Sequence, residues 1–194
     1  MHSAKFPMHR DLAGFDFEVS PVDRKLVHQL ANLSFIEAAH NAVLVGGPGT
    51  GKTHLVTAIG VSGITRHGMR VRFYSTVDLV NALEQEKTQG KAGRIAASLL
   101  RMDLVILDEL GYLPFSQAGG ALLFHLLSRL YEHTSVLDVA VRCRCATGGC
   151  RPMIWNCTLG VAVAVLLRAE VLDLHVRTFT TALRRTVNRT WTSR

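Results

Sequence analysis

Short apolar runs and amphipathic segments alternate along the first 136 residues of the chain. Three apolar runs predict buried β-strands at residues 42–45, 71–74 and 104–107. Apolar residues at helical spacing predict helices at residues 52–66, 76–89, 94–100 and 117–132, after a first helix that begins at Ser20 and Pro21. Strands that alternate with helices form βαβ units, so the pattern predicts an α/β fold with a mainly parallel sheet.

Two local patterns add detail to this prediction. Residues Ser75 to Asp78 have the form of a capping box, in which the Ser75 side chain caps the helix that follows. Residues 135–141 should form a fourth strand, but Asp138 interrupts their apolar pattern, and an unpaired carboxylate is costly to bury. We therefore expect this fourth strand to be truncated or distorted.

A glycine-rich loop joins the first predicted strand to the next helix. Its residues, Gly46-Gly47-Pro48-Gly49-Thr50-Gly51-Lys52-Thr53, match the phosphate-binding pattern G-x-x-x-x-G-K-[ST], the Walker A motif. The glycines allow backbone N–H groups to point at phosphate oxygens, and the helix that follows adds its positive dipole end. In this motif Lys52 supplies a cation to the β- and γ-phosphates, and the Thr53 hydroxyl can bind Mg²⁺. The loop therefore predicts binding of ATP with Mg²⁺.

An acidic pair ends the third predicted strand, as in a Walker B element. Asp108 and Glu109 follow the apolar run and lie 56 and 57 residues after Lys52. The carboxyl ends of parallel strands bind ligands in open α/β sheets, so Asp108 can hold Mg²⁺ there. Glu109 can polarise the water that attacks the γ-phosphate. The adjacent pair favours ATP hydrolysis over kinase chemistry, with Lys52 and Glu109 as the candidate catalytic residues.

The distribution of charge divides the chain near residue 136. The whole chain has a net charge of +7, but residues 1–136 hold 13 basic and 12 acidic residues, whereas residues 137–194 hold nine arginines and three acids. We therefore divide the chain into a lead segment (1–20), a nucleotide-binding core (21–136) and an atypical basic tail (137–194). We expect the tail to pack poorly against the core, and a frameshift near codon 137 is its simplest explanation.

Composition also bears on where the protein acts. The longest strictly apolar run, residues 159–167, has nine residues, whereas a membrane span needs about 20. The first ten residues have no apolar signal-peptide core, so we expect a cytoplasmic protein with no membrane partner. The four cysteines, all in the tail, lack the paired spacing of a structural zinc site. We interpret them as free thiols that bind no metal.

Two groups of residues allow two interpretations each. Lys87, Lys91 and Arg94 make a basic stretch around Gly90 that is either a solvated surface or a contact for DNA phosphates. Phe15 and Phe17 either anchor the lead segment to the core or form walls of an adenine pocket. The sequence leaves both choices open.

Several segments together resemble one family of ATP-binding proteins. They are Phe15-Asp-Phe17, the 46–53 loop with His54-Leu55, Arg72 to Thr76, Leu107-Asp-Glu-Leu-Gly-Tyr-Leu-Pro114, Gly119 to His125 and Tyr131-Glu132. This set resembles the IstB-type ATP-binding proteins of insertion sequences, over about residues 5–136. The family is similar to the DnaC helicase loaders and belongs to the AAA+ ATPases.

The resemblance implies a function that the residue patterns alone do not. Family members assemble on double-stranded DNA as ATP-bound oligomers and assist a cognate transposase in DNA transposition. An arginine from a neighbouring subunit completes their hydrolytic site. Three alternatives stay open: a helicase-loader-like ATPase, a DNA-bound component that binds ATP without turnover, and a non-functional fragment that at most binds nucleotide.

The chain also departs from the usual pattern of this family. We expect it to lack the helical N-terminal domain, since few residues precede the matching segment. After Ser135-Val136 no residue matches the family's polar sensor, and none matches its arginine finger. Loss of such an arginine can cost about 10³-fold in rate, so ATP binding is expected and hydrolysis should be far slower than in an intact relative.

Overall fold

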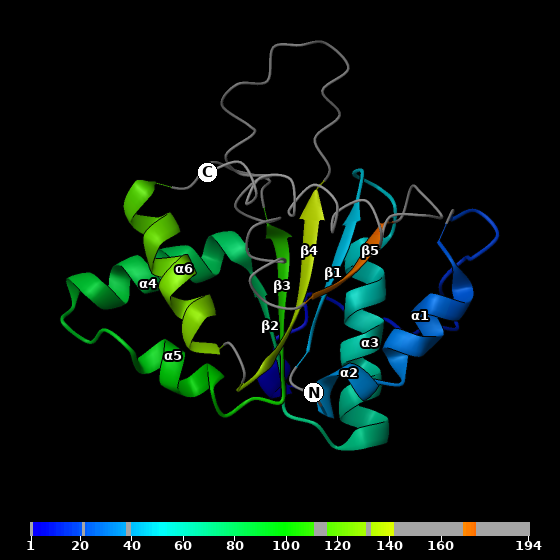
Figure 1. Cartoon of the computed structure of the whole chain (residues 1–194), viewed down its shortest axis with the longest axis horizontal. Helices are drawn as coiled ribbons and strands as arrows, with labels where there is room; N and C mark the ends of the chain where they lie inside the picture. Colours follow the sequence, from blue (N-terminus) through cyan, green and yellow to red (C-terminus); the bar gives the residue numbers. More distant parts are fainter. Residues whose placement is uncertain are drawn as a thin grey trace, which may run out of the picture.

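The computed structural model describes residues 2–20, 22–37, 40–110, 116–130, 133–141 and 169–173. The elements run in the order η1 (His2–Ala4), α1 (Arg24–Ala31), α2 (Ser34–Glu37), β1 (Asn41–Gly46), α3 (Lys52–His67), β2 (Val71–Ser75), α4 (Thr76–Thr88), α5 (Arg94–Leu99), β3 (Leu104–Leu110), α6 (Gln117–Leu130), β4 (Ser135–Val141) and β5 (Ala169–Asp173). Strands and helices alternate from β1 to β4, which confirms the α/β fold predicted from the sequence (Figure 1).

The described strands form a single sheet in which every neighbouring pair is parallel. The strand order is β2-β3-β4-β1-β5. Parallel pairing brings the carboxyl ends of all strands to one edge, where β1 leads into the 46–53 loop and β3 carries the acidic pair just before its last residue. The topology therefore places both predicted motifs at the same edge of the sheet, with β4 between their strands.

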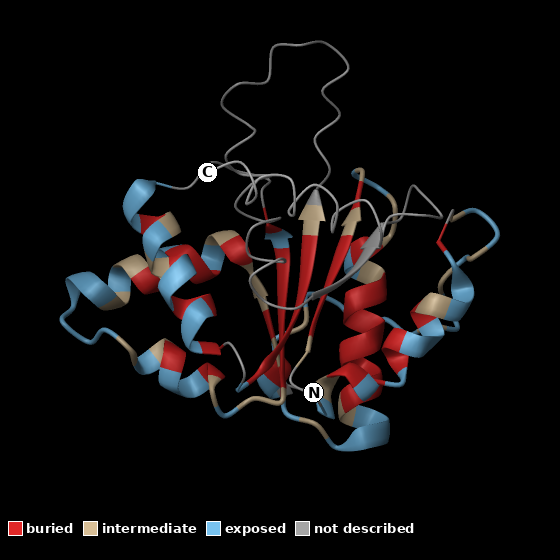
Figure 2. Ribbon diagram, viewed as in Figure 1, coloured by how far each residue is buried: buried red, intermediate tan, exposed pale blue. Residues whose placement is uncertain are grey.

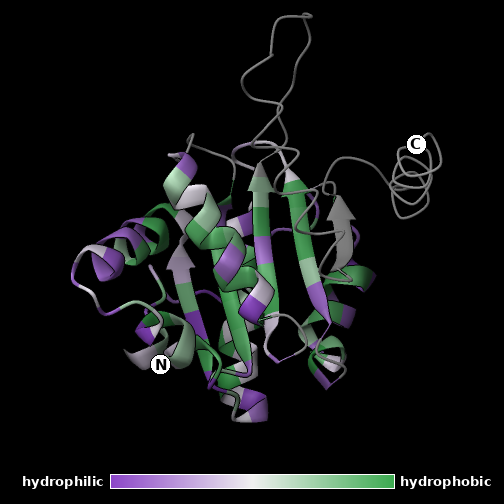
Figure 3. Cartoon of the chain, turned by 60° about the vertical axis from the view of Figure 1, so that its left-hand side comes forward, coloured by the Kyte–Doolittle hydropathy of each residue, from purple (hydrophilic) through white to green (hydrophobic). Residues whose placement is uncertain are grey.

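Helices cover both faces of the sheet and bury two apolar cores (Figures 1 and 2). One core contains side chains of α1, α2 and α3 together with Ile106 and Leu137, and the other contains side chains of α4, α5 and α6 together with Val105 and Leu107. Successive residues of β3 thus point to opposite faces, as in any strand that is buried on both sides. Apolar residues accordingly dominate the central strands in Figure 3.

The helix boundaries follow the predicted pattern, with one correction at the first helix. Helix α3 begins at Lys52 and ends at His67, where Gly68 adopts the left-handed conformation (φ 64°) as the C-cap. The predicted start of the first helix at Ser20 and Pro21 is wrong, because α1 begins at Arg24 and its N-cap is Asp23, whose side chain accepts a hydrogen bond from the Lys25 N–H. The apolar face predicted for this helix is confirmed by the burial of Val27 and Leu30.

The expectation of a truncated fourth strand is wrong. Strand β4 spans Ser135–Val141 and pairs in parallel with β1 on one side and β3 on the other. Backbone pairing on both sides holds Asp138 in line with Val43 and Leu107, although its side chain is polar. The only irregularity lies in the pairing with β3, whose register shifts between Leu107 and Leu110.

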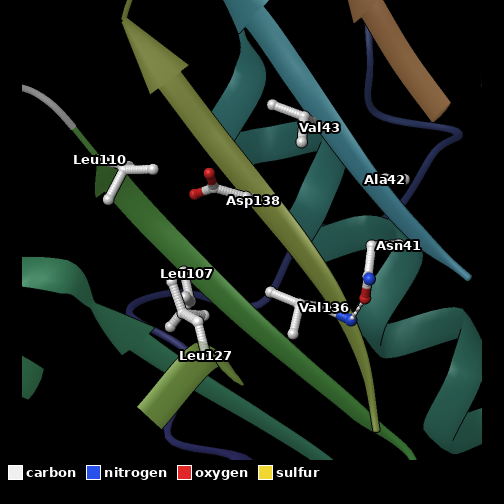
Figure 4. A pocket seen from close by; sticks show the side chains of 8 residues that line it. All are labelled: Asn41, Ala42, Val43, Leu107, Leu110, Leu127, Val136 and Asp138. Atoms are coloured by element: carbon white, nitrogen blue, oxygen red, sulfur yellow. Dashed lines mark hydrogen bonds between the residues drawn. The ribbon is translucent and has the colours of Figure 1, made fainter. Parts of the chain in front are cut away.

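Asp138 is buried among apolar side chains on the face covered by α6. Its carboxyl group borders a cavity of about 10 Å³ and points toward Leu110 (Figure 4), with Leu107, Leu127 and Val136 among the other lining residues. Its Oδ1 atom has no hydrogen-bond partner in the described structure. Burial is the main reason that its pKa rises from 3.8 to about 8; repulsion from Asp108 adds to this shift, and the Val139 N–H opposes it. At neutral pH Asp138 is therefore mostly protonated.

The change of composition near residue 136 does not coincide with the end of an element. Strand β4 crosses it, and Leu137 and Val139 belong to the core. Strand β5, which the sequence pattern did not indicate, pairs in parallel with β1. The four cysteines, the apolar run 159–167 and most of the predicted tail lie outside the described residues. Among the described helices, none has the length and apolar character of a membrane span.

Candidate nucleotide-binding site

The 46–53 loop has the backbone of an anion-binding turn. Strand β1 is buried along most of its length and ends at Gly46, where the loop begins. Gly49 and Gly51 adopt left-handed conformations (φ 75° and 83°), which glycine tolerates best. Gly51 is the N-cap of α3, and no side chain among the described residues caps the helix, so within this part of the chain its first N–H groups stay available. These groups and the helix dipole favour an anion at this point.

The Lys52 side chain folds back over this loop. Its Nζ atom donates hydrogen bonds to the carbonyl oxygens of Gly46 (3.0 Å) and Gly47 and to Thr50 Oγ1 (3.3 Å). Burial lowers the pKa of Lys52, whereas attraction to Asp108 opposes that shift. The ammonium group therefore lies within the loop and interacts electrostatically with the carboxylate at the end of β3.

The acidic pair has two different environments. Asp108 is buried, and its Oδ1 atom accepts a hydrogen bond from the Glu109 N–H at 2.9 Å. Glu109 is exposed and adopts a left-handed conformation (φ 67°), which is uncommon for residues other than glycine. This residue lies within the register shift between Leu107 and Leu110. The irregular backbone separates the two carboxylates into one that points inward and one that faces solvent.

The last residue of β2 and the first residue of α4 contact this acidic pair. Ser75, at the end of β2, lies opposite Asp108 in the parallel register, and its hydroxyl donates to Glu109 Oε2 at 3.1 Å. The neighbouring Thr76 hydroxyl is buried and donates to the Asp108 carbonyl oxygen at 2.7 Å. Ser75 is the N-cap of α4 by position, but its side chain makes no capping bond, so this part of the capping-box prediction is wrong. The contacts of both hydroxyls were not predicted.

The oxygen ligands available here suit Mg²⁺. Thr53 and Asp108 offer a hydroxyl and a carboxylate, and magnesium in nucleotide sites is held by one or two such groups together with phosphates and water. The described residues contain no group of three or more His, Cys, Asp or Glu side chains that could hold a metal alone. Such a cluster is not needed where phosphate oxygens complete the coordination. The Thr53 side chain is exposed at the start of α3, where a ligand can reach it.

Phe15 and Phe17 lie between the core and an open cavity. Both are half-buried, and both pack against the core on the α3 side of the sheet. They also line a cavity of about 450 Å³ together with Arg24, His28 and Arg66. The Phe17 ring stacks against His28 and lies under the Arg24 guanidinium, 5.3 Å from its carbon. The two rings thus anchor the lead segment and also form part of a cavity wall.

The basic stretch predicted around Gly90 is exposed. Lys87, at the end of α4, and Lys91 and Arg94 before and within α5 all face solvent. Nearby Glu86 accepts hydrogen bonds from the N–H groups of Gly93 and Ile95, so its carboxylate holds the turn between the helices. This stretch is therefore an ordered surface with three exposed cations.

Comparison with known proteins identifies the family. The sequence profile described as "IstB-like ATP binding protein" matches residues 1–141 of the chain. The chain belongs to the IstB-like ATP-binding protein family. A protein of Pseudomonas aeruginosa, named for ATP binding and the insertion sequence IS21, is 39% identical over 138 residues, which are 71% of this chain and 52% of that protein.

A second relative supports the same family, and both relatives are longer than the segment that they share with this chain. An IS5376 protein of Geobacillus stearothermophilus, also named for ATP binding, is 35% identical over 135 residues, 69% of this chain and 53% of the relative. The chain thus spans about half the length of the IstB-like relatives it matches. The match ends where β4 ends, five residues beyond the predicted boundary at 136.

Solved structures share the fold. A crystal structure of the DnaC helicase loader aligns with a TM-score of 0.65 at 21% identity, over 77% of this chain and 86% of the other. The replication initiator DnaA, bound to AMPPCP and single-stranded DNA, aligns with a TM-score of 0.65 at 18% identity, over 95% of this chain and 56% of the other. The chain therefore shares the fold of these two proteins, in agreement with the AAA+ type that the family resemblance implies.

Proposed function

We propose that the chain binds ATP with Mg²⁺ at the 46–53 loop. The observation that carries this proposal is the position of Lys52. Its ammonium group lies within the loop at the start of α3 and is attracted by the carboxylate of Asp108. Phosphate oxygens can replace the loop carbonyls as partners of Lys52, and the backbone N–H groups of Gly49 to Thr53 can surround the phosphates. Thr53 and Asp108 would then hold Mg²⁺.

Hydrolysis would rely on Glu109. Its exposed carboxylate lies next to Asp108 and can accept a proton from the water that attacks the γ-phosphate. In the described structure Ser75 holds this carboxylate through one hydrogen bond. In intact relatives an arginine from a neighbouring subunit speeds the reaction. No residue of this chain is assigned to that role, so we expect hydrolysis to be far slower here.

The wider role we propose is that of a helper in DNA transposition. Relatives named for the insertion sequences IS21 and IS5376 support it. The protein would assemble as a homo-oligomer on double-stranded DNA in the cytoplasm and assist a cognate transposase. Lys87, Lys91 and Arg94 form an exposed basic surface that fits the phosphate backbone of DNA.

Titration with nucleotide and DNA tests these steps separately. Calorimetry with ATP and Mg²⁺ measures nucleotide binding, and an ATPase assay with and without double-stranded DNA measures turnover.

Replacing Lys87 with Gln should reduce the slope of log affinity for DNA against log salt by about 1, since one phosphate contact is lost. Lys25→Gln, an exposed lysine of α1, is the matched control. Equal slopes in both variants contradict the proposed DNA surface.

A helicase-loader-like role is the second candidate. The fold match with the DnaC helicase loader supports it, because 86% of that structure aligns with this chain. Co-purification distinguishes the two roles, with a transposase of the insertion-sequence type as one candidate partner and the replicative helicase of the host as the other. Binding of ATP without turnover in the presence of DNA and either partner would instead indicate that the nucleotide acts only as an assembly ligand.

A further inference from the structure

His54 connects the nucleotide-binding loop to the N-terminal part of the chain. It follows Thr53 in α3, and its Nε2 atom lies 2.9 Å from the carbonyl oxygen of Asp11, 43 residues away. A carbonyl oxygen only accepts hydrogen bonds, so Nε2 must be the donor. The His54 ring also meets the Phe15 ring edge-to-face, with centroids 5.3 Å apart. One side chain thus makes two different contacts with the same short segment.

That segment, residues 11–15, is a turn with its own internal support, and we call it the N-terminal turn. The Asp11 side chain accepts a hydrogen bond from the Gly14 N–H at 2.8 Å, and the Phe15 N–H donates to the Leu12 carbonyl oxygen at 3.3 Å. Leu12 and Phe15 pack against the core. The turn is therefore shaped locally, and the bond to His54 fixes its position relative to the beginning of α3.

The turn presses an aromatic ring against the loop. A Cβ atom added to Gly51 would lie 2.6 Å from Phe15 Cε2, closer than any real contact allows. The Phe15 ring therefore lies directly against the backbone of the N-cap residue of α3. A movement of the N-terminal turn would change the surroundings of the loop, since no side chain stands between the ring and Gly51.

The N-terminal turn lies on the side of the loop where a nucleoside is expected. Asp108 and Glu109, the residues proposed to act at the γ-phosphate end, lie near the carboxyl end of β3, which is separated from β1 by β4. Phe15 shares its cavity with residues of α1, and α1 lies beyond α3, away from β3 (Figure 1). A triphosphate that runs along the loop from the acidic pair would therefore leave its ribose and base near His54 and Phe15.

We propose that His54 is a positioning residue, which fastens the N-terminal turn to α3 so that Phe15 forms a wall for the nucleoside part of a bound nucleotide. This inference rests on the proposed binding of ATP and adds a role for a residue that lies outside the 46–53 loop. It predicts that His54 contributes to the affinity for ATP but not to the affinity for a triphosphate without a nucleoside.

Three variants and two ligands test this proposal. His54→Ala removes both contacts, His54→Gln keeps an amide donor at the position of Nε2, and Phe15→Ala removes the wall itself. Calorimetry measures binding of ATP and of inorganic tripolyphosphate, each with Mg²⁺. Hydrogen exchange of the 12–17 backbone amides, measured without ligand, reports on the turn directly. Melting curves of all variants check that each one folds.

The expected pattern is specific. His54→Ala and Phe15→Ala should bind ATP about tenfold more weakly, the size of one lost hydrogen bond or ring contact, and should bind tripolyphosphate as the unaltered chain does. Exchange in the turn should rise in His54→Ala and return toward normal in His54→Gln. An equal loss for both ligands would show that His54 supports the loop alone, and unchanged affinity and exchange in His54→Ala would also overturn the proposal.

Failure of the proposed function gives a different result. If the unaltered chain binds neither ATP nor tripolyphosphate, the assignment of the 46–53 loop is wrong, and with it the role of Phe15 as a nucleoside wall. The exchange measurement then still decides whether His54 fastens the turn. If the chain binds both ligands with equal affinity, the loop assignment stands and the nucleoside wall alone is contradicted.

Discussion

The hydroxyl of Ser75 donates a hydrogen bond to Glu109 Oε2 at 3.1 Å, and this bond joins the ends of the adjacent strands β2 and β3. Glu109 is held in a left-handed backbone conformation (φ 67°) at the same point. The hydrogen bond fixes the direction of this carboxylate toward Ser75, so it must be broken before Glu109 can turn to another partner. The proposed catalytic base is thus restrained by a side chain from the neighbouring strand.

Replacing Ser75 with Ala should therefore raise the basal rate of ATP hydrolysis, by a factor of about 2 to 10, which corresponds to one ordinary hydrogen bond. Steady-state phosphate release measures this rate, and ATP affinity should stay within a factor of two. Ser128→Ala is a matched control, because in the described part of the chain the Ser128 hydroxyl donates to the Phe124 carbonyl oxygen of the same helix. A fall in turnover would instead show that Ser75 orients Glu109 for the reaction.

Replacing Lys52 with Ala should abolish most ATP binding. Lys52 is the cation whose Nζ atom lies within the loop, bound to the carbonyl oxygens of Gly46 and Gly47. Calorimetry should show ATP affinity at least 100-fold weaker, an order of magnitude expected for the loss of a charged hydrogen-bond donor. Lys25→Ala, which alters an exposed lysine of α1, should bind normally. Equal affinities for both variants contradict the assignment of the loop.

Replacing Glu109 with Gln should separate binding from hydrolysis. The amide cannot accept a proton from water, so turnover should fall by about 10²- to 10⁴-fold, whereas ATP affinity should change little because Asp108 and Lys52 are untouched. Phosphate release and calorimetry on the same preparation measure the two quantities. Turnover that survives this substitution would mean that another group accepts the proton.

The sequence predicts those parts of the molecule whose causes are local. Strands β1 and β3 are apolar runs, and the glycines around α3 mark its ends, so both the loop and the acidic pair could be placed before the structure. The capping prediction at Ser75 was wrong because a carboxylate 34 residues away takes its hydroxyl. The contact of His54 with Asp11 likewise joins residues that are distant in the sequence. The pattern of residues around Ser75 or His54 cannot predict a partner that is so distant in the sequence.

Asp138 shows in the core that prediction from neighbouring residues alone has the same limit. Its polarity suggested a broken strand, yet β4 pairs with a neighbour on each side across this position. Pairing of the backbone in a central strand outweighs one unfavourable side chain, provided that the carboxyl group is protonated. Strand β5 was not expected either, because its pairing with β1 spans more than 120 residues of sequence.

The burial of Asp138 predicts that stability falls as pH rises. The folded chain keeps this proton up to a pKa of about 8, whereas an unfolded aspartate loses it near 3.8. The folded state thus binds more protons between these values, and the free energy of unfolding should decrease with pH by about 1.4 kcal/mol per unit on account of this group. The contribution of the Asp138 proton to the free energy of unfolding is complete below about pH 4 and lost above about pH 8.

Replacing Asp138 with Asn should remove this dependence, since the amide does not titrate. We expect the difference in unfolding free energy between Asp138→Asn and the unaltered chain to move in favour of the variant as pH rises from 5 to 8, by about 1.4 kcal/mol per unit. Urea unfolding at several pH values measures it. Asp78→Asn, at an exposed position of α4, should follow the unaltered chain. A constant difference between the two chains across this range would mean that Asp138 is ionised in the folded state, with water or a neighbouring group stabilising its charge.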